Sequence, residues 1–132
     1  MKTPTKHTRG QSLIEFALVI PLLLLLMVGI MEFSRAWMAK NILTGAAREA
    51  ARIAVVPPPG GSVADGYNRG NEVLASAGLS GATISIDPGV GAHGTVIATA
   101  SYSFPVTVVG FIPGLASATI PLSSTTTMRR EY

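Results

Sequence analysis

The 132-residue sequence contains no cysteine and only two histidines, so it is poor in the residues that build catalytic and metal sites. Disulfides, thiolate nucleophiles and cysteine-based metal sites are excluded. His7 and His93 do not form a pair with metal-ligand spacing, and neither accompanies a candidate nucleophile. We therefore expect no cofactor, no metal, no small-molecule substrate and no enzymatic activity.

Charged residues are also scarce, at 13% of the chain, and they are unevenly distributed. Ten basic residues face seven acidic ones, but three of the ten (Lys2, Lys6 and Arg9) lie in the first nine residues, where there is no acid. After these nine residues, the numbers of basic and acidic residues are equal. No basic stripe interleaved with aromatic residues remains to follow a phosphate backbone, so nucleic acid is not an expected partner.

One long apolar run is present near the N-terminus. Between Leu13 and Met31 the only charged residue is Glu15, and the length of this run matches the roughly 17–25 residues that a helix needs to cross a bilayer. A carboxylate at the centre of a bilayer costs about 2.5–3.5 kcal/mol, and less near its edge, so Glu15 is a candidate functional residue that needs a partner. Pro21 is tolerated in a membrane helix, and we expect a kink or a local weakening of the helix there.

The helical pattern continues beyond the apolar run. From Glu32 to Val56 there is no proline and one glycine, whereas seven alanines supply high helix propensity. The sequence predicts one long helix over residues 11–56 that spans a membrane over about 13–31 and is amphipathic afterwards. The predicted inward stripe of the second half consists of Met38, Ile42, Gly45, Ala46, Glu49, Ala50 and Ile53.

The charged residues of this long helix give two further expectations. Glu32 with Arg35, and Glu49 with Arg52, have i,i+3 spacing and are interpreted as ordinary surface ion pairs. Basic residues flank the apolar run in nearly equal numbers on both sides, so the charge rule alone does not set the orientation of the helix in a membrane.

The rest of the chain predicts a small α+β domain over residues 57–132. Prolines and glycines at 57–61 end the long helix. A second, short helix is expected from about Ala64 to Ala77, closed by Gly78, with its first turns weakened by glycines. The residues expected to face inward are Tyr67, Val73, Leu74 and Ala77, and the weakening glycines are Gly66 and Gly70.

The periodicity then changes from 3.6 to 2, which indicates strands. Residues 82–87 and 96–104 alternate around a loop and predict a hairpin. A third strand is expected from about Ala116 to Met128, with Pro121 marking an edge or a bulge. Its inward residues are expected to be Ala118, Ile120, Leu122 and Met128.

The fold expected from these elements is a long N-terminal helix packed on three antiparallel strands and one short helix. The segment 104–115 is apolar without clean alternation. Two interpretations of it are open, a connection buried against the long helix and an exposed patch for a neighbouring subunit.

Near the N-terminus the sequence resembles a known family. Gly10, the residues QSLI, and then Glu15 and Phe16 at the start of an apolar helix resemble the leader of type IV pilins and pseudopilins. The longer stretch RGQSLIEFALVIPLLLLLMVGIMEFSRAW, followed by AAREAARIA, resembles the TadE-like minor pseudopilins of the Tad, or Flp, pilus machinery. This resemblance covers residues 9–55, about a third of the chain, and the ending TTTMRREY is similar more loosely.

The resemblance implies a structural subunit with no enzymatic role. Residues 1–10 would be a leader, removed between Gly10 and Gln11 by the prepilin peptidase on the cytoplasmic face. The matching glutamate of pilins neutralises the N-terminal amine of an adjacent subunit, so Glu15, with Phe16 beside it, would set the register of assembly. The implied partners are the membrane, the peptidase, and other pilins and pseudopilins; TadE, TadF and TadG types are all compatible.

The implied location is the bacterial inner membrane, crossed once, with the N-terminus in the cytoplasm and the C-terminal domain in the periplasm. A secretory signal peptide is the alternative interpretation. Ser34, Arg35 and Ala36 form a small-x-small cleavage site, which would release a secreted or surface binding protein that begins at Trp37. The apolar run is long for a signal peptide, however, and the helical pattern continues through the proposed cut.

Overall fold

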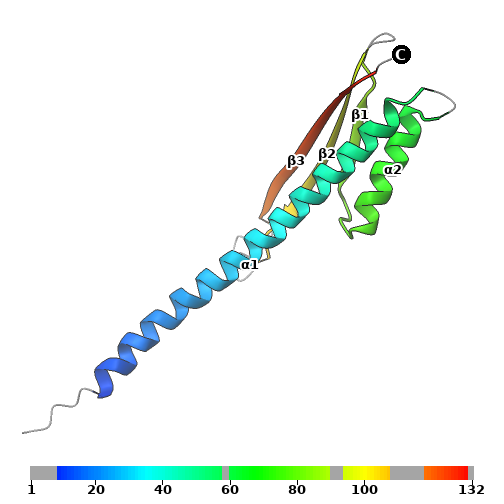
Figure 1. The fold of residues 1–132 in the computed structure, drawn as a ribbon. Coiled ribbons are helices and arrows are strands. Elements are labelled where there is room, and N and C mark those ends of the chain that lie inside the picture. Colours follow the sequence, from blue (N-terminus) through cyan, green and yellow to red (C-terminus); the bar gives the residue numbers. More distant parts are fainter. Residues whose placement is uncertain (1–8, 58–59, 90–93, 108–117, 131–132) are drawn as a thin grey trace, which may run out of the picture.

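The computed structural model describes residues 9–57, 60–89, 94–107 and 118–130. It consists of one long helix that projects from a small head (Figure 1). The elements are α1 (Arg9–Ala54), α2 (Val63–Ser76), β1 (Thr83–Asp87), β2 (Thr95–Pro105) and β3 (Thr119–Arg129). The expected α+β fold, with a long apolar helix, three antiparallel strands and one short helix, is confirmed.

Helix α1 has two halves with different surroundings. It continues through Pro21 without an end, and from Gly10 to Met27 every residue is exposed. In the second half the head packs along the helix, and the fully or nearly fully buried positions are almost all alanines. These positions are Ala39, Leu43, Ala46, Ala47, Ala50, Ala51 and Ala54.

The predicted inward stripe of α1 is therefore partly wrong. Ala46 and Ala50 are buried as expected, but Met38 is 65% exposed and Gly45 is also exposed. The stripe is rotated toward the alanines because their single methyl groups let the sheet and α2 approach the helix backbone closely. Larger members of the predicted stripe, such as Ile42, lie at the margin of the contact and are half-buried.

Helix α2 packs on α1 through its glycines. The side chain of Ser62 caps its first turn by accepting a hydrogen bond from the Asp65 backbone N–H at 3.1 Å. Gly66 and Gly70 are buried together with Leu74, whereas Tyr67 and Ala77 are exposed, contrary to expectation. The glycines are thus the contact face of this helix rather than its weak point.

The sheet has the order β1-β2-β3, and both pairs are antiparallel. The predicted hairpin is confirmed, with Ile84 of β1 opposite Ala100 of β2. The face toward α1 carries the buried residues of β2, and the opposite face carries mostly serine and threonine. The buried residues of β2 are Val96, Ala98, Ala100 and Phe104.

Strand β3 is an edge strand, as its proline predicted, and its register with β2 contains no bulge. The backbone N–H of Val106 donates to Ala118, and that of Arg130 donates to Gly94. Hydrogen-bonded and non-hydrogen-bonded pairs alternate in an antiparallel ladder, so the odd-numbered residues of β3 direct their backbone groups to the free edge. Pro121 is one of them and offers no N–H to an incoming strand.

The side chains expected to face inward from β3 contribute less burial than predicted. Ala118, Leu122 and Met128 are half-buried, and Ile120, opposite Phe104 at the end of the sheet, is 48% exposed. Of the apolar segment 104–115, Phe104 is buried, whereas residues 108–115 lie outside the described residues.

We expect Gly66→Ala to destabilise the head by about 1–3 kcal/mol through overpacking. A Cβ at this position would lie 2.6 Å from the Ala50 carbonyl oxygen and 3.0 Å from the Ala54 methyl group. Thermal unfolding of the full chain in detergent, followed by circular dichroism, measures the effect. The matched control is Gly45→Ala in α1, where nothing lies within 4 Å; it should gain about 0.5–1 kcal/mol. Equal effects of the two substitutions would contradict the packing of α2.

Candidate membrane and assembly surface

The first half of α1 is an apolar surface that no other described part of the chain covers. Leu18, Leu25 and Ile30, for example, are each more than 60% exposed. Within the described residues, α1 is the one helix that is long and apolar enough to cross a membrane. Such a surface is stable only against lipid or against other apolar helices.

At the beginning of α1 lie the residues that the sequence singled out for processing and register. The Gln11 side-chain amide donates a hydrogen bond to Glu15 Oε1 at 3.3 Å, so the structure brings these two residues together on one face. Phe16 is 63% exposed, and no neighbour lies within 4 Å of a Cβ placed on Gly10. Pro21 is more than a turn further along the helix. Residues 1–8 of the expected leader lie outside the described residues.

Where the apolar half ends, Glu32 and Arg35 attach α1 to the end of β2. Arg35 donates to Glu32 Oε2 at 2.6 Å and to the Thr107 hydroxyl at 2.8 Å, and the backbone N–H of Thr107 donates to the Glu32 carboxylate. The Arg35 guanidinium also lies over the Phe104 ring, 5.3 Å from its centroid. The interpretation as an ordinary surface pair was incomplete, because the pair holds a segment more than 70 residues away.

Two further polar contacts attach α1 to β3. The Lys40 ammonium donates to the Ser123 carbonyl oxygen, and the hydroxyls of Thr44 and Ser124 are 2.9 Å apart. One turn of α1 is thereby matched to two consecutive residues of β3, which fixes the axial position of the helix on the sheet. Sequence reasoning missed these contacts because their partners are separated by about 80 residues and have no motif.

Comparison with known families bears on this helix. Residues 10–52 match the family described as TadE-like protein. Over this segment the chain is similar to that family. The match begins at Gly10, includes Glu15 and Pro21, and ends two residues before the end of α1. No curated protein and no solved structure matches the chain. This similarity and the apolar helix point to a subunit associated with a Tad pilus machinery and a membrane.

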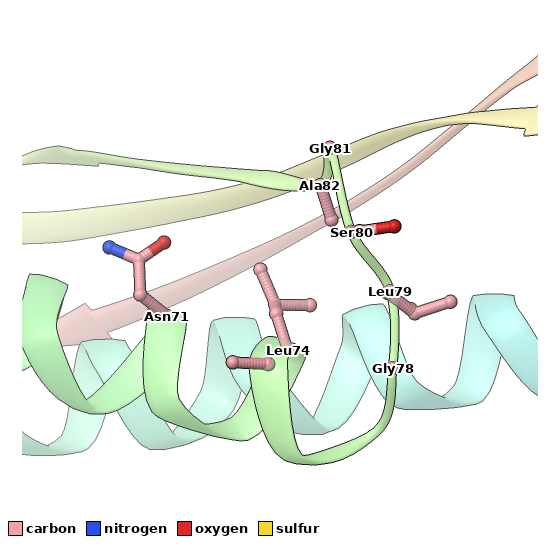
Figure 2. Close-up of a pocket in the computed structure, with 8 residues that line it drawn as sticks. Asn71, Leu74, Gly78, Leu79, Ser80, Gly81 and Ala82 are labelled. Carbon is pink, nitrogen blue, oxygen red and sulfur yellow. The ribbon is translucent and has the colours of Figure 1, made fainter.

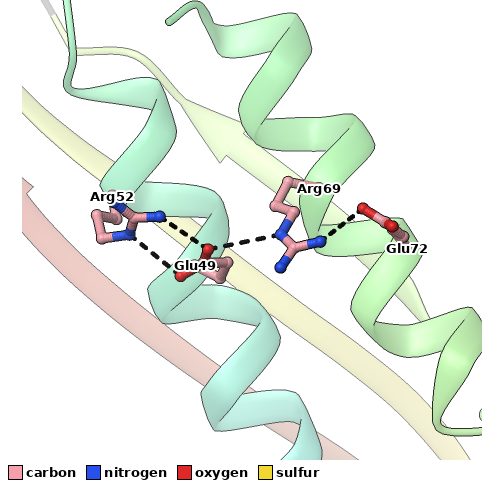
Figure 3. A network of polar contacts seen from close by, with 4 residues as sticks. All are labelled: Glu49, Arg52, Arg69 and Glu72. Atoms are coloured by element: carbon pink, nitrogen blue, oxygen red, sulfur yellow. Dashed lines mark hydrogen bonds and ion pairs between the residues drawn. The ribbon is translucent and has the colours of Figure 1, made fainter.

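At the end of the matched segment, an ionic network joins α1 to α2 (Figure 3). Glu49 accepts from Arg52 at 2.9 Å and lies 3.5 Å from Arg69, which in turn donates to Glu72 at 2.7 Å. The hydrogen bond from Arg52 lowers the pKa of Glu49 most, against a smaller opposing effect of burial, and Arg69 lowers it further. The expected Glu49 and Arg52 pair is therefore part of a contact between the two helices.

The described residues offer little for catalysis or metal binding. A depression of about 400 Å³ lies between the end of α2 and the start of β1, and Figure 2 shows its lining. The lining consists of apolar residues such as Leu74, the amide of Asn71 and the hydroxyl of Ser80, and it contains no titratable group. Among the described ranges no three residues of the metal-binding types come together; His7 and His93 lie outside those ranges.

We expect Glu49→Gln to lower the stability of the head by less than about 1 kcal/mol at neutral pH, because the network is at the surface. Folding lowers the pKa of Glu49 below its unfolded value, near 4.5. The carboxylate therefore stabilises the folded head above pH 4.5, and this stabilisation is lost as the pH falls through the pKa of the folded state. The difference in unfolding temperature between the wild type and this variant should therefore shrink below pH 4.5. Glu72→Gln, which breaks a contact within α2 alone, is the control. A difference independent of pH would refute this account.

Proposed function

We propose that this protein is a minor pseudopilin of a Tad-type pilus, a non-enzymatic subunit that is cleaved after Gly10 and assembles through α1. The observation that carries the proposal is the exposed apolar half of the helix with Glu15 as its single charged residue between Gly10 and Met31. The match of residues 10–52 to the TadE-like family supports it.

The position of Glu15 gives the proposal its physical mechanism. Cleavage between Gly10 and Gln11 creates an α-amine four residues, or about 6 Å of helix rise, before Glu15. Gln11 already reaches Glu15 with its side chain. In an assembly the amine of one copy neutralises the Glu15 carboxylate of the next, and the pairing of two otherwise uncompensated charges in an apolar environment fixes the axial register.

The same proposal sets the orientation and the partners. The basic leader stays on the cytoplasmic side, where the prepilin peptidase reaches Gly10. Helix α1 crosses the inner membrane once, and the head lies in the periplasm, where it meets other pilins and pseudopilins. Extraction of α1 from the membrane into a filament requires that neighbouring helices cover the side chains that lipid covered before.

The alternative, a signal peptide cut after Ala36, conflicts with the contacts at the base of the head. Such a cut would remove both Glu32 and Arg35, and with them the hydrogen bonds to Thr107 and the cation above Phe104. It would also divide a continuous helix that the head packs along. These contacts favour a product that retains α1 from Gln11 onward.

We expect the mature protein isolated from its native cells to begin at Gln11. Mass spectrometry of the N-terminal peptide measures this directly. Gly10→Leu should block processing because a bulky side chain replaces the residue at the cut, whereas Gly29→Ala, at an equally open position of the same helix, should leave it intact. A mature N-terminus at Trp37 would establish the signal peptide instead, and one at Met1 in an assembled pilus would refute cleavage.

We expect Glu15→Gln to leave membrane insertion and processing unchanged and to reduce incorporation into pili about tenfold or more. The amine of the neighbouring copy would then lose its counter-charge, and breaking a buried pair costs about 3–5 kcal/mol. Membrane fractionation and immunoblotting of sheared pili measure the two quantities. Glu72→Gln removes a carboxylate from the head and should incorporate normally. Normal incorporation of the Glu15 variant would contradict the register mechanism.

A further inference from the structure

The single tryptophan of the chain lies at the junction of α1 and the head. Trp37 is stacked on Phe33 with ring centroids 6.1 Å apart, and both side chains are more than 60% exposed. An exposed aromatic pair is unfavourable in water, but at a membrane surface such rings lie in the headgroup layer, where an apolar body and a polar edge are both accommodated.

The length of the apolar run places Trp37 at that depth. From Leu13 to Met31 the helix rises about 27 Å, which is close to the roughly 30 Å of a hydrocarbon core. Trp37 lies about 9 Å further along the axis, and Lys40 about 13 Å. A run of about 27 Å centred in a core of about 30 Å leaves Trp37 about 7.5 Å beyond the core, and the headgroup layer adds about 5–8 Å on each side. Because helix side chains lean toward the N-terminus, the Trp37 ring lies in the outer part of this layer. The Lys40 ammonium lies at its surface, where it also donates to Ser123.

A groove opens beside these residues, between α1 and β3. It has a volume of about 380 Å³ and is lined from α1 by Phe33, Trp37 and Lys40 and from β3 by Pro121 and Leu122. Its floor and walls are largely apolar, and Lys40 is the single charged side chain of the lining. The ammonium uses one of its three donors on the Ser123 carbonyl oxygen, so two donors remain for an anion.

We propose that this groove binds the headgroup of a membrane phospholipid, with Trp37 in the headgroup layer and the Lys40 ammonium on the phosphate. The occupant follows from continuity, because the groove begins where the membrane-spanning half of α1 ends and shares Phe33 with the apolar surface below it. The inference rests on the membrane anchoring of α1 and is independent of cleavage after Gly10 and of pilus assembly.

The depth of Trp37 is tested by fluorescence of the full chain reconstituted in phosphatidylcholine vesicles. Since Trp37 is the sole tryptophan, its emission needs no correction. We expect a blue shift relative to the unfolded chain, and stronger quenching by lipids brominated near the headgroup end of the acyl chain than by lipids brominated near its tip. Absence of quenching, or strongest quenching by the deep bromines, would overturn the proposal.

The headgroup contact is tested by native mass spectrometry of the chain released from vesicles that contain equal amounts of phosphatidylglycerol and phosphatidylcholine. We expect retained phospholipid, enriched in the anionic species, and a loss of several-fold in that retention for Lys40→Gln. Lys40→Arg should retain lipid, and Arg48→Gln, which removes the same charge from an exposed position of α1, should behave as the wild type.

Equal lipid retention in all four proteins would refute a role for Lys40 and with it the proposed site. Circular dichroism melting of each variant establishes that the head is folded, because Lys40 also contacts Ser123. If Lys40→Gln were unfolded, Trp37→Ala would serve as the second variant. The Trp37 ring lines the groove, and among the described residues it makes no hydrogen bond to the sheet. Unchanged lipid retention in this variant would equally refute the proposal.

Discussion

One continuous helix must satisfy two environments, and the rest of the structure depends on where they meet. Between Leu13 and Met31, α1 exposes large apolar side chains on all sides, so this surface is stable only in lipid or among other helices. From Lys40 to its C-terminal end, the same helix is covered on one side by the sheet and α2. The change occurs within about two helical turns, and in this interval Arg35 contacts Thr107, just after β2, and Lys40 contacts Ser123 of β3.

These polar contacts and the alanine stripe have complementary roles. Alanine methyl groups bring the sheet close to α1 but do little to fix the axial position of the helix on the sheet. On a surface of small side chains, many axial positions have similar packing energy. Hydrogen bonds from Arg35 to Thr107 and from Lys40 to Ser123 depend on one axial position. These hydrogen bonds therefore hold the head at a defined height above the apolar half of α1.

The sequence predicted the elements and the class of the fold, because periodicity, proline and alanine content are local properties. It predicted less well which faces meet. Tyr67 was expected to face inward, yet it is exposed, and Gly66 and Gly70 are buried beside Leu74. Close approach of two helices depends on the alanines of the partner as much as on the helix itself. The attachment of Glu32 and Arg35 to Thr107 could not be predicted either, because it joins segments that only the folded topology brings together.

The anchor also restricts how two copies associate. β3 runs alongside α1 in the same direction (Figure 1), so antiparallel pairing of β3 with β3 of a second copy would point the two helices in opposite directions. Two copies inserted in one membrane with the same orientation cannot do this. The edge is further closed near the membrane, where Pro121 has no N–H and Lys40 occupies the Ser123 carbonyl. Antiparallel pairing through β3 is thus closed to anchored copies, whereas the exposed half of α1, which also carries Glu15, is open to contact between them.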